Sequence, residues 1–198
     1  MQAIREAETT TAGEIYCVVA RSSDSYFFPA AFTVLCCVLV ASLAAAFALD
    51  GRWFAPRPPL FAAAQVLAVA AALGVLLAFP ALRLRLTPKG IRYAHAHANA
   101  VKQFLARNIH ITTERTGVLI FVSLAERYAE IIADSGINAY VPQSAWDEIV
   151  RDLVVHARRD CLTEGYVAAI RAVGALLARH FPPPADNRSE LDDHLIEI

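Results

Sequence analysis

The stretch that decides the fold is residues 116–136, TGVLIFVSLAERYAEIIADSG, in which a short polar turn separates two apolar runs. The first run, residues 118–124, is unbroken and rich in Val, Leu and Ile, which predicts a strand buried on both faces. The second run, residues 128–133, alternates more and ends at the turn residues 134–136, which predicts a strand nearer the sheet edge. The short turn between them requires antiparallel pairing.

A third buried strand is predicted upstream, at residues 14–20 (EIYCVVA). An amphipathic helix follows before the next strand, and it should begin at Thr87-Pro88, with Thr as the N-cap and Pro at the first helical position. Its apolar stripe runs to Leu105 at spacings of three and four residues. The order strand, helix, strand requires a parallel crossover between residues 14–20 and 118–124.

Two more helices complete the predicted domain. One begins at Pro142, and the other is expected to be capped by Thr163 and to end at the three prolines of residues 182–184. The apolar face of the last helix is formed by Tyr166, Ile170, Val173 and Leu177. We therefore predict an α/β fold: a small mixed β-sheet of three to four strands covered by helices and interrupted by a two-helix hairpin.

The interrupting hairpin consists of residues 27–49 and 60–79, which contain no charged side chain. A helix rising about 1.5 Å per residue needs about 20 apolar residues to cross a bilayer core of about 30 Å. Burial in a soluble core is the alternative, but a small domain can hardly enclose two helices that are apolar on every side. We therefore predict a transmembrane hairpin, with Gln65 hydrogen-bonded to the first helix and Trp53 and Phe54 at the interface.

Basic residues flanking the hairpin predict its orientation. Those on the side of the termini are Arg21, Arg83, Arg85, Lys89 and Arg92, and those on the loop side are Arg52 and Arg57. Because basic residues accumulate in cytoplasmic flanks, both termini and the α/β domain are predicted to be cytoplasmic. The chain is thus expected to be a two-pass protein of the cell membrane.

The chain divides into four predicted segments. They are the first helix and strand at 1–26, the transmembrane hairpin at 27–79, the remainder of the α/β domain at 80–181, and a Pro-rich and acidic tail at 182–198. The formal net charge is −1, so no global basic field is available to attract nucleic acid. The expected partners are the lipid bilayer and an unidentified membrane or cytosolic protein.

The order of these elements resembles the TPM domain family, a group of small α/β domains usually attached to membranes. The residues that carry the resemblance are 4–8 (IREAE), 11–15 (TAGEI), 116–122 (TGVLIFV), Glu126-Arg127, 128–136, 147–150, Gly165-Tyr166 and the last helix. It covers roughly residues 1–20 and 87–181. The sequence departs from the family at two places, where G-Y-G reads Asp134-Ser135-Gly136 and G-D-Y reads Glu164-Gly165-Tyr166.

The resemblance implies two classes of function, because family members are associated with accessory roles (photosystem repair, receptor accessory function) and in some cases with acid phosphatase activity. A phosphatase needs a nucleophile or a metal-activated water, and cations for the phosphate. Carboxylates at strand ends that could hold a divalent cation such as calcium or magnesium are Glu126, Glu130 and Asp134. The sequence contains no D-x-D cluster, so solvated turn carboxylates are the alternative, and no catalytic residue is assigned.

His95 and His97 are the other candidates for metal ligands. Residues i and i+2 of a helix point about 200° apart, so these two cannot chelate one ion together. With no concentrated catalytic chemistry, we predict a membrane-anchored, non-enzymatic accessory or assembly module without a resident cofactor. A divalent-metal-dependent acid phosphatase is the alternative.

Overall fold

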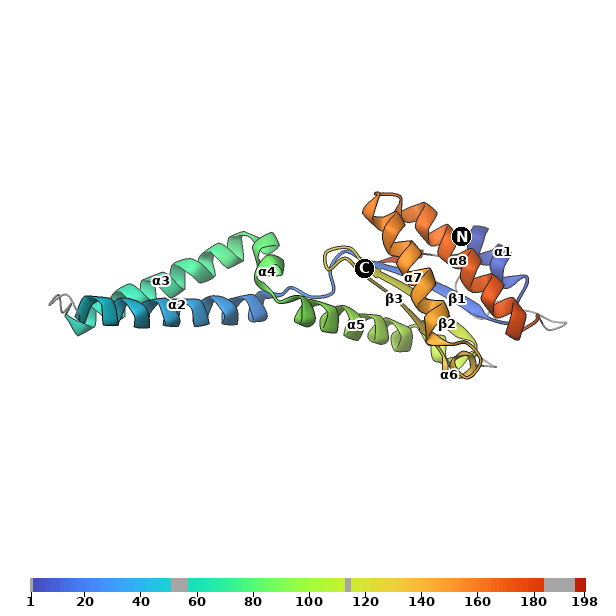
Figure 1. The fold of residues 1–198 in the computed structure, drawn as a ribbon, viewed down its shortest axis with the longest axis horizontal. Coiled ribbons are helices and arrows are strands. Elements are labelled where there is room, and N and C mark those ends of the chain that lie inside the picture. Colours follow the sequence, from blue (N-terminus) through green and yellow to red (C-terminus); the bar gives the residue numbers. More distant parts are fainter. Residues whose placement is uncertain (1, 51–56, 113–114, 184–194) are drawn as a thin grey trace. The chain divides into compact units, whose positions relative to one another are not determined.

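The computed structural model describes residues 2–50, 57–112, 115–183 and 195–198, which form two compact units (Figure 1). One unit comprises residues 1–23 and 93–198, and the other comprises residues 24–92. The elements of the first unit are α1 (Gln2–Glu8), β1 (Glu14–Ala20), most of α5 (Lys89–Ala106), η1 (Ile109–Ile111), β2 (Gly117–Ser123), β3 (Tyr128–Ala133), α6 (Ser135–Asn138), α7 (Gln143–Arg158), α8 (Leu162–His180) and β4 (Leu195–Glu197). Those of the second are α2 (Phe27–Asp50), α3 (Pro58–Ala78) and α4 (Pro80–Leu86).

The first unit is built on a four-stranded mixed sheet in the order β3-β2-β1-β4. β1 runs parallel to β2, with Glu14 opposite Gly117, and β2 runs antiparallel to β3, with Val118 opposite Ala133. The predicted α/β class, the parallel crossover, the antiparallel hairpin and the edge position of residues 128–133 are all confirmed.

One strand lies where the sequence predicted only a tail. Residues Leu195–Glu197 form β4 and pair in parallel with residues 17–19 of β1. The amide of Ile198 also donates to the Val19 carbonyl at 2.9 Å. These three residues cover an edge of β1 that would otherwise present unpaired backbone groups.

The sheet is covered on both faces. On one face, Ala100 and Phe104 of α5 pack against Tyr16 and Val18 of β1 and Phe121 of β2. On the other face, α1, α7 and α8 close a larger core around the alternate residues of β1 and β2. The four residues predicted to line the last helix are all buried: Tyr166, Ile170, Val173 and Leu177.

Both predicted N-caps were wrong. Cys161 occupies the cap position of α8, and its side chain makes no capping hydrogen bond, so Thr163 lies inside the helix. Thr87 instead ends α4, because residues 80–86 form a short helix that the sequence did not indicate. Its hydroxyl donates backward to the Arg83 carbonyl at 2.9 Å, and α5 begins two residues later.

The second unit contains two helices long and apolar enough to cross a membrane, at residues 27–49 and 58–78. The core helix of a soluble protein would be mostly buried, but the most apolar window of the first is not buried at all and that of the second is 6% buried. As predicted, Gln65 of α3 donates a hydrogen bond of 2.6 Å to the Ser42 hydroxyl of α2. Trp53, Phe54 and Arg52 lie outside the described residues.

The two flanks of this hairpin lie against each other. The Arg83 guanidinium of α4 lies 5.6 Å from the centre of the Phe27 ring at the start of α2. It also donates hydrogen bonds to the carbonyls of Leu76 and Leu77, at 2.6 and 3.0 Å, which are among the unpaired carbonyls at the end of α3. Arg83 therefore ties the outgoing end of the hairpin to its incoming end.

Candidate functional site

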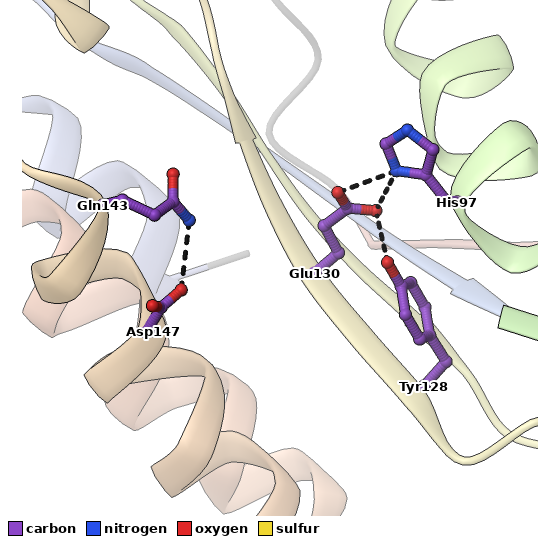
Figure 2. A network of polar contacts seen from close by, with 5 residues as sticks. All are labelled: His97, Tyr128, Glu130, Gln143 and Asp147. Atoms are coloured by element: carbon purple, nitrogen blue, oxygen red, sulfur yellow. Dashed lines mark hydrogen bonds and ion pairs between the residues drawn. The ribbon is translucent and has the colours of Figure 1, made fainter. Parts of the chain in front are cut away.

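A groove of about 380 Å³ runs along β3 in the first unit. One wall is α5, which contributes His97 and Val101, and the other is α7, which contributes Trp146 and Asp147. The floor is β3 itself. Figure 2 shows the polar side chains of both walls and the floor, with His97 and Asp147 on opposite sides of Glu130.

The polar centre of the groove is Glu130. Its carboxylate accepts a hydrogen bond from the Tyr128 hydroxyl at 3.0 Å, and its two oxygens lie 2.9 and 3.0 Å from Nδ1 of His97 (Figure 2). The period of two in a strand places Tyr128 and Glu130 on the face that α5 covers. A carboxylate has about four lone-pair sites, so Glu130 retains the capacity to accept from one more donor.

The Tyr128 hydroxyl is a hydrogen-bond donor in this arrangement. Burial raises the pKa of its hydroxyl, and the negative charge of Glu130 and the hydrogen bond to it raise it further. The ring of Tyr128 also lies 5.3 Å, centre to centre, from that of Tyr93 on α5. The neutral phenol therefore holds the Glu130 carboxylate in place over the physiological pH range.

The α7 wall presents a second carboxylate. Asp147 is exposed, and its Oδ1 accepts a hydrogen bond of 3.1 Å from the Gln143 amide one turn earlier (Figure 2). Trp146 beside it is 2% exposed. Within the described residues, its indole N–H has no hydrogen-bond partner, which is uncommon for a buried donor.

β3 also offers backbone groups to this groove. Among the described strands, β2 is its one neighbour. The amide of Asp134 donates to the Gly117 carbonyl at 2.9 Å, which identifies that pair as a hydrogen-bonded pair of the antiparallel ladder. Because such pairs alternate, Ala129, Ile131 and Ala133 direct their backbone N–H and C=O groups away from β2.

The three predicted metal ligands do not meet. β3 is six residues long and rises about 3.3 Å per residue, so Glu126 before it and Asp134 after it lie roughly 20 Å apart. Glu130 lies between them and faces the groove. Among the described residues, no group of three or more His, Cys, Asp or Glu side chains is placed to hold a metal ion. Within the described residues, the structure therefore does not bring these three candidate ligands together at one site.

Each of the outer two carboxylates has a local structural partner. Glu126 is 2% exposed and accepts hydrogen bonds from the Ser23 amide at 2.9 Å and from the hydroxyls of Ser22 and Ser123. Asp134 caps α6 through the Ser135 amide at 2.6 Å and lies 3.7 Å from the Arg115 guanidinium. Both therefore hold the ends of the β2–β3 hairpin.

The sequence did not reveal the role of His97. The helical spacing correctly indicated that the rings of His95 and His97 point in different directions. The partner of His97, however, is Glu130, which is 33 residues away on another element. The available signal was positional. His97 is three residues from Ala94 and four from Val101 in the apolar stripe, so it borders the face that packs on the sheet.

Comparison with known proteins shows what the domain is similar to. The model of the TPM domain family matches residues 87–176, which run from the end of α4 into α8. None of the curated proteins matches this chain. Among solved structures, the chain is similar to the NMR structure of the BA42 protein from the psychrophilic bacterium Bizionia argentinensis. The TM-score is 0.58 at 18% identity, covering 99% of this chain and 88% of that one.

The two comparisons agree with the fold described above. At 18% identity the structural similarity speaks for the fold alone, and the family match is limited to residues 87–176. The family match covers β2, β3 and the two helices that form the groove, and the structural similarity covers 99% of the chain. Residues 87–176 of this chain are therefore similar to the TPM domain, and the chain shares the fold of the BA42 protein.

Proposed function

We propose that this chain is a membrane-anchored interaction module whose TPM domain binds a partner protein through the groove at β3. The observation that carries the proposal is the groove itself, which combines an open sheet edge, two helical walls and a buried indole N–H without a partner among the described residues. Concave sites with a few convergent polar groups are the usual places where proteins bind ligands.

The hairpin supports attachment to the bilayer. Large apolar side chains of α2 and α3 are widely exposed, among them Phe28 at 81%, Phe47 at 72% and Leu67 at 69%. Exposed apolar area on this scale is unfavourable in water and favourable in lipid. The polar pair Gln65 and Ser42 satisfies itself between the helices, as side chains in a lipid-embedded hairpin must.

We further propose that the domain and both termini face the cytoplasm. A membrane-impermeant maleimide applied to intact cells should react with a cysteine introduced by Ala55→Cys and should miss one introduced by Ser189→Cys, because positive flanks stay inside. The exposed Cys161 is an internal control that should react only after the cells are opened. The reverse pattern would place the domain outside the cell.

Photo-crosslinking in native membranes tests the proposed binding site. A photoreactive amino acid replaces Asn138, which lines the groove, and in a second variant replaces Arg171, an exposed position on α8. We expect a discrete adduct of defined mass from position 138, at least about tenfold stronger than from position 171, because binding energy concentrates in a few residues of an interface and the groove is the proposed interface. Equal labelling from the two positions would contradict the proposal.

The alternative implied by the family is a divalent-metal-dependent acid phosphatase. It is tested on the same purified protein with a generic phosphate ester and calcium or magnesium. Hydrolysis abolished by Asp134→Ala or Glu126→Ala would replace the interaction module with an enzyme. Glu148→Gln, on an exposed side chain of α7, provides the matched control.

A further inference from the structure

We infer that the groove takes an extended, basic segment of its partner, which adds to the sheet as a fifth strand alongside β3. The inference rests on the proposed function and specifies the conformation and charge of the ligand. It is carried by three features of the groove: the direction of the backbone groups of β3, the two helical walls and the placement of two carboxylates.

The backbone of β3 is prepared for another strand. The ladder with β2 turns the N–H and C=O groups of Ala129, Ile131 and Ala133 outward. The Asn138 side chain confirms this direction, because its amide donates to the Ala133 carbonyl at 3.0 Å from the outer side. Asn138 therefore occupies the last outward carbonyl, and the groups of Ala129 and Ile131 lie upstream of it, where a ligand strand can pair.

The walls explain why the ligand should be extended. α5 and α7 stand on opposite faces of the sheet at this edge (Figure 2). An added strand lies about 4.8 Å from β3 and directs successive side chains to opposite faces. One set of ligand side chains would thus meet His97 and Glu130, and the other set would meet Trp146 and Asp147. Strand addition with side-chain selection is an established mode of peptide recognition.

The charge of the groove favours a basic ligand. Glu130 supplies a carboxylate on the α5 side and Asp147 supplies one on the α7 side. Two lysine or arginine side chains that lie an odd number of positions apart in the ligand would point to opposite faces, so one could reach Glu130 and the other Asp147. A second copy of this chain is a poorer occupant, because its β3 edge carries the same two carboxylates and like charges would face each other.

Peptide binding to the full-length protein in detergent tests the inference. The probe is a fluorescein-labelled octapeptide of alternating Thr and Val with two adjacent lysines, and its counterpart carries glutamates in their place. We expect the basic peptide to bind about tenfold more tightly than the acidic one, measured by anisotropy at low salt. Asp147→Asn and Glu130→Gln should each weaken it about threefold to fivefold, while Glu148→Gln leaves it unchanged.

N-methylation distinguishes strand addition from other contacts. Two versions of the basic peptide carry N-methyl groups on alternate residues, one version on the odd and the other on the even positions. Only one set can face β3, so one version should lose binding at least about tenfold and the other should keep it. Ala129→Pro, which removes an outward N–H at an edge position that tolerates proline, should weaken the basic peptide by a similar factor.

The possible failures can be told apart. Equal binding of basic and acidic peptides would overturn the charge assignment, and equal effects of the two N-methyl sets would overturn strand addition. Absence of peptide binding together with a strong adduct from position 138 would overturn this inference and leave the proposed function standing. Absence of both would overturn both. A dimer in detergent that Ala129→Pro converts to a monomer would identify a second copy as the occupant instead.

Discussion

Gly117→Ala should destabilise the domain by roughly 3 kcal/mol, the upper part of the range for overpacking a closed site. A Cβ at Gly117 would lie 2.2 Å from the backbone oxygen of Ile109 and 2.7 Å from its Cγ2 atom. The oxygen belongs to η1 and is not the end of a flexible side chain, so either η1 or the start of β2 has to move. Gly117 is also paired on both sides, with Glu14 in β1 and through its carbonyl with the Asp134 amide.

Thermal unfolding of the full chain in a mild detergent measures this effect. A loss of roughly 3 kcal/mol corresponds to a decrease of about 10 °C in Tm for a chain of this size. The matched control is Gly90→Ala in the first turn of α5, where an added Cβ meets nothing within 4 Å. That change should leave Tm unchanged or raise it slightly, because alanine is the better helix former. A Tm for Gly117→Ala equal to that of the control would contradict this expectation, because η1 would then move aside with little loss of stability.

The sheet was predictable because its central strands are long and locally distinctive. Residues 118–124 and 14–20 are apolar runs that need burial on both faces. The order of elements then requires a parallel crossover between them, and such crossovers have one preferred handedness. β4 was not predictable for the opposite reason. Its three residues, LIE, carry no periodicity, and they become a strand only because β1 offers them an edge.

Helix ends were the least accurate part of the prediction. Thr163 and Thr87 both had the residue type of an N-cap, but the chain before Thr87 was already helical. A helical approach lets its hydroxyl bond backward to Arg83, four residues earlier. Capping preference describes one residue, whereas the start of a helix depends on the conformation of the segment before it.

The groove was hidden from the sequence for a geometric reason. Glu130 was singled out, but only as one of three carboxylates that could hold a divalent cation. A strand rises about 3.3 Å per residue, so Glu126 before β3 and Asp134 after it both lie far from Glu130 along the strand. The true neighbours of Glu130 are Tyr128 on the same face and His97 from α5, and only the packing of α5 on the sheet brings His97 there.

Replacing residues 25–83, the proposed membrane anchor, with a flexible Gly/Ser linker should give a soluble, folded α/β domain. The change removes nearly all of the compact unit formed by residues 24–92 and leaves the core of the other unit intact. Replacing a long connection with a shorter flexible one changes closure entropy little, by about 0.6 kcal/mol for each twofold difference in length. The exposed apolar side chains of α2 and α3, and with them the proposed attachment to the bilayer, leave with the segment.

Fractionation and circular dichroism measure the outcome of this replacement. The full-length chain should sediment with membranes, and the shortened one should remain in the soluble fraction with a cooperative thermal transition. Gly117→Ala in the shortened chain should lower its Tm by about as much as in the full-length chain, because both changes act on separate parts of the structure. A shortened chain that is insoluble or lacks a cooperative transition, while the full-length chain in detergent is folded, would show that the hairpin is part of the domain's core.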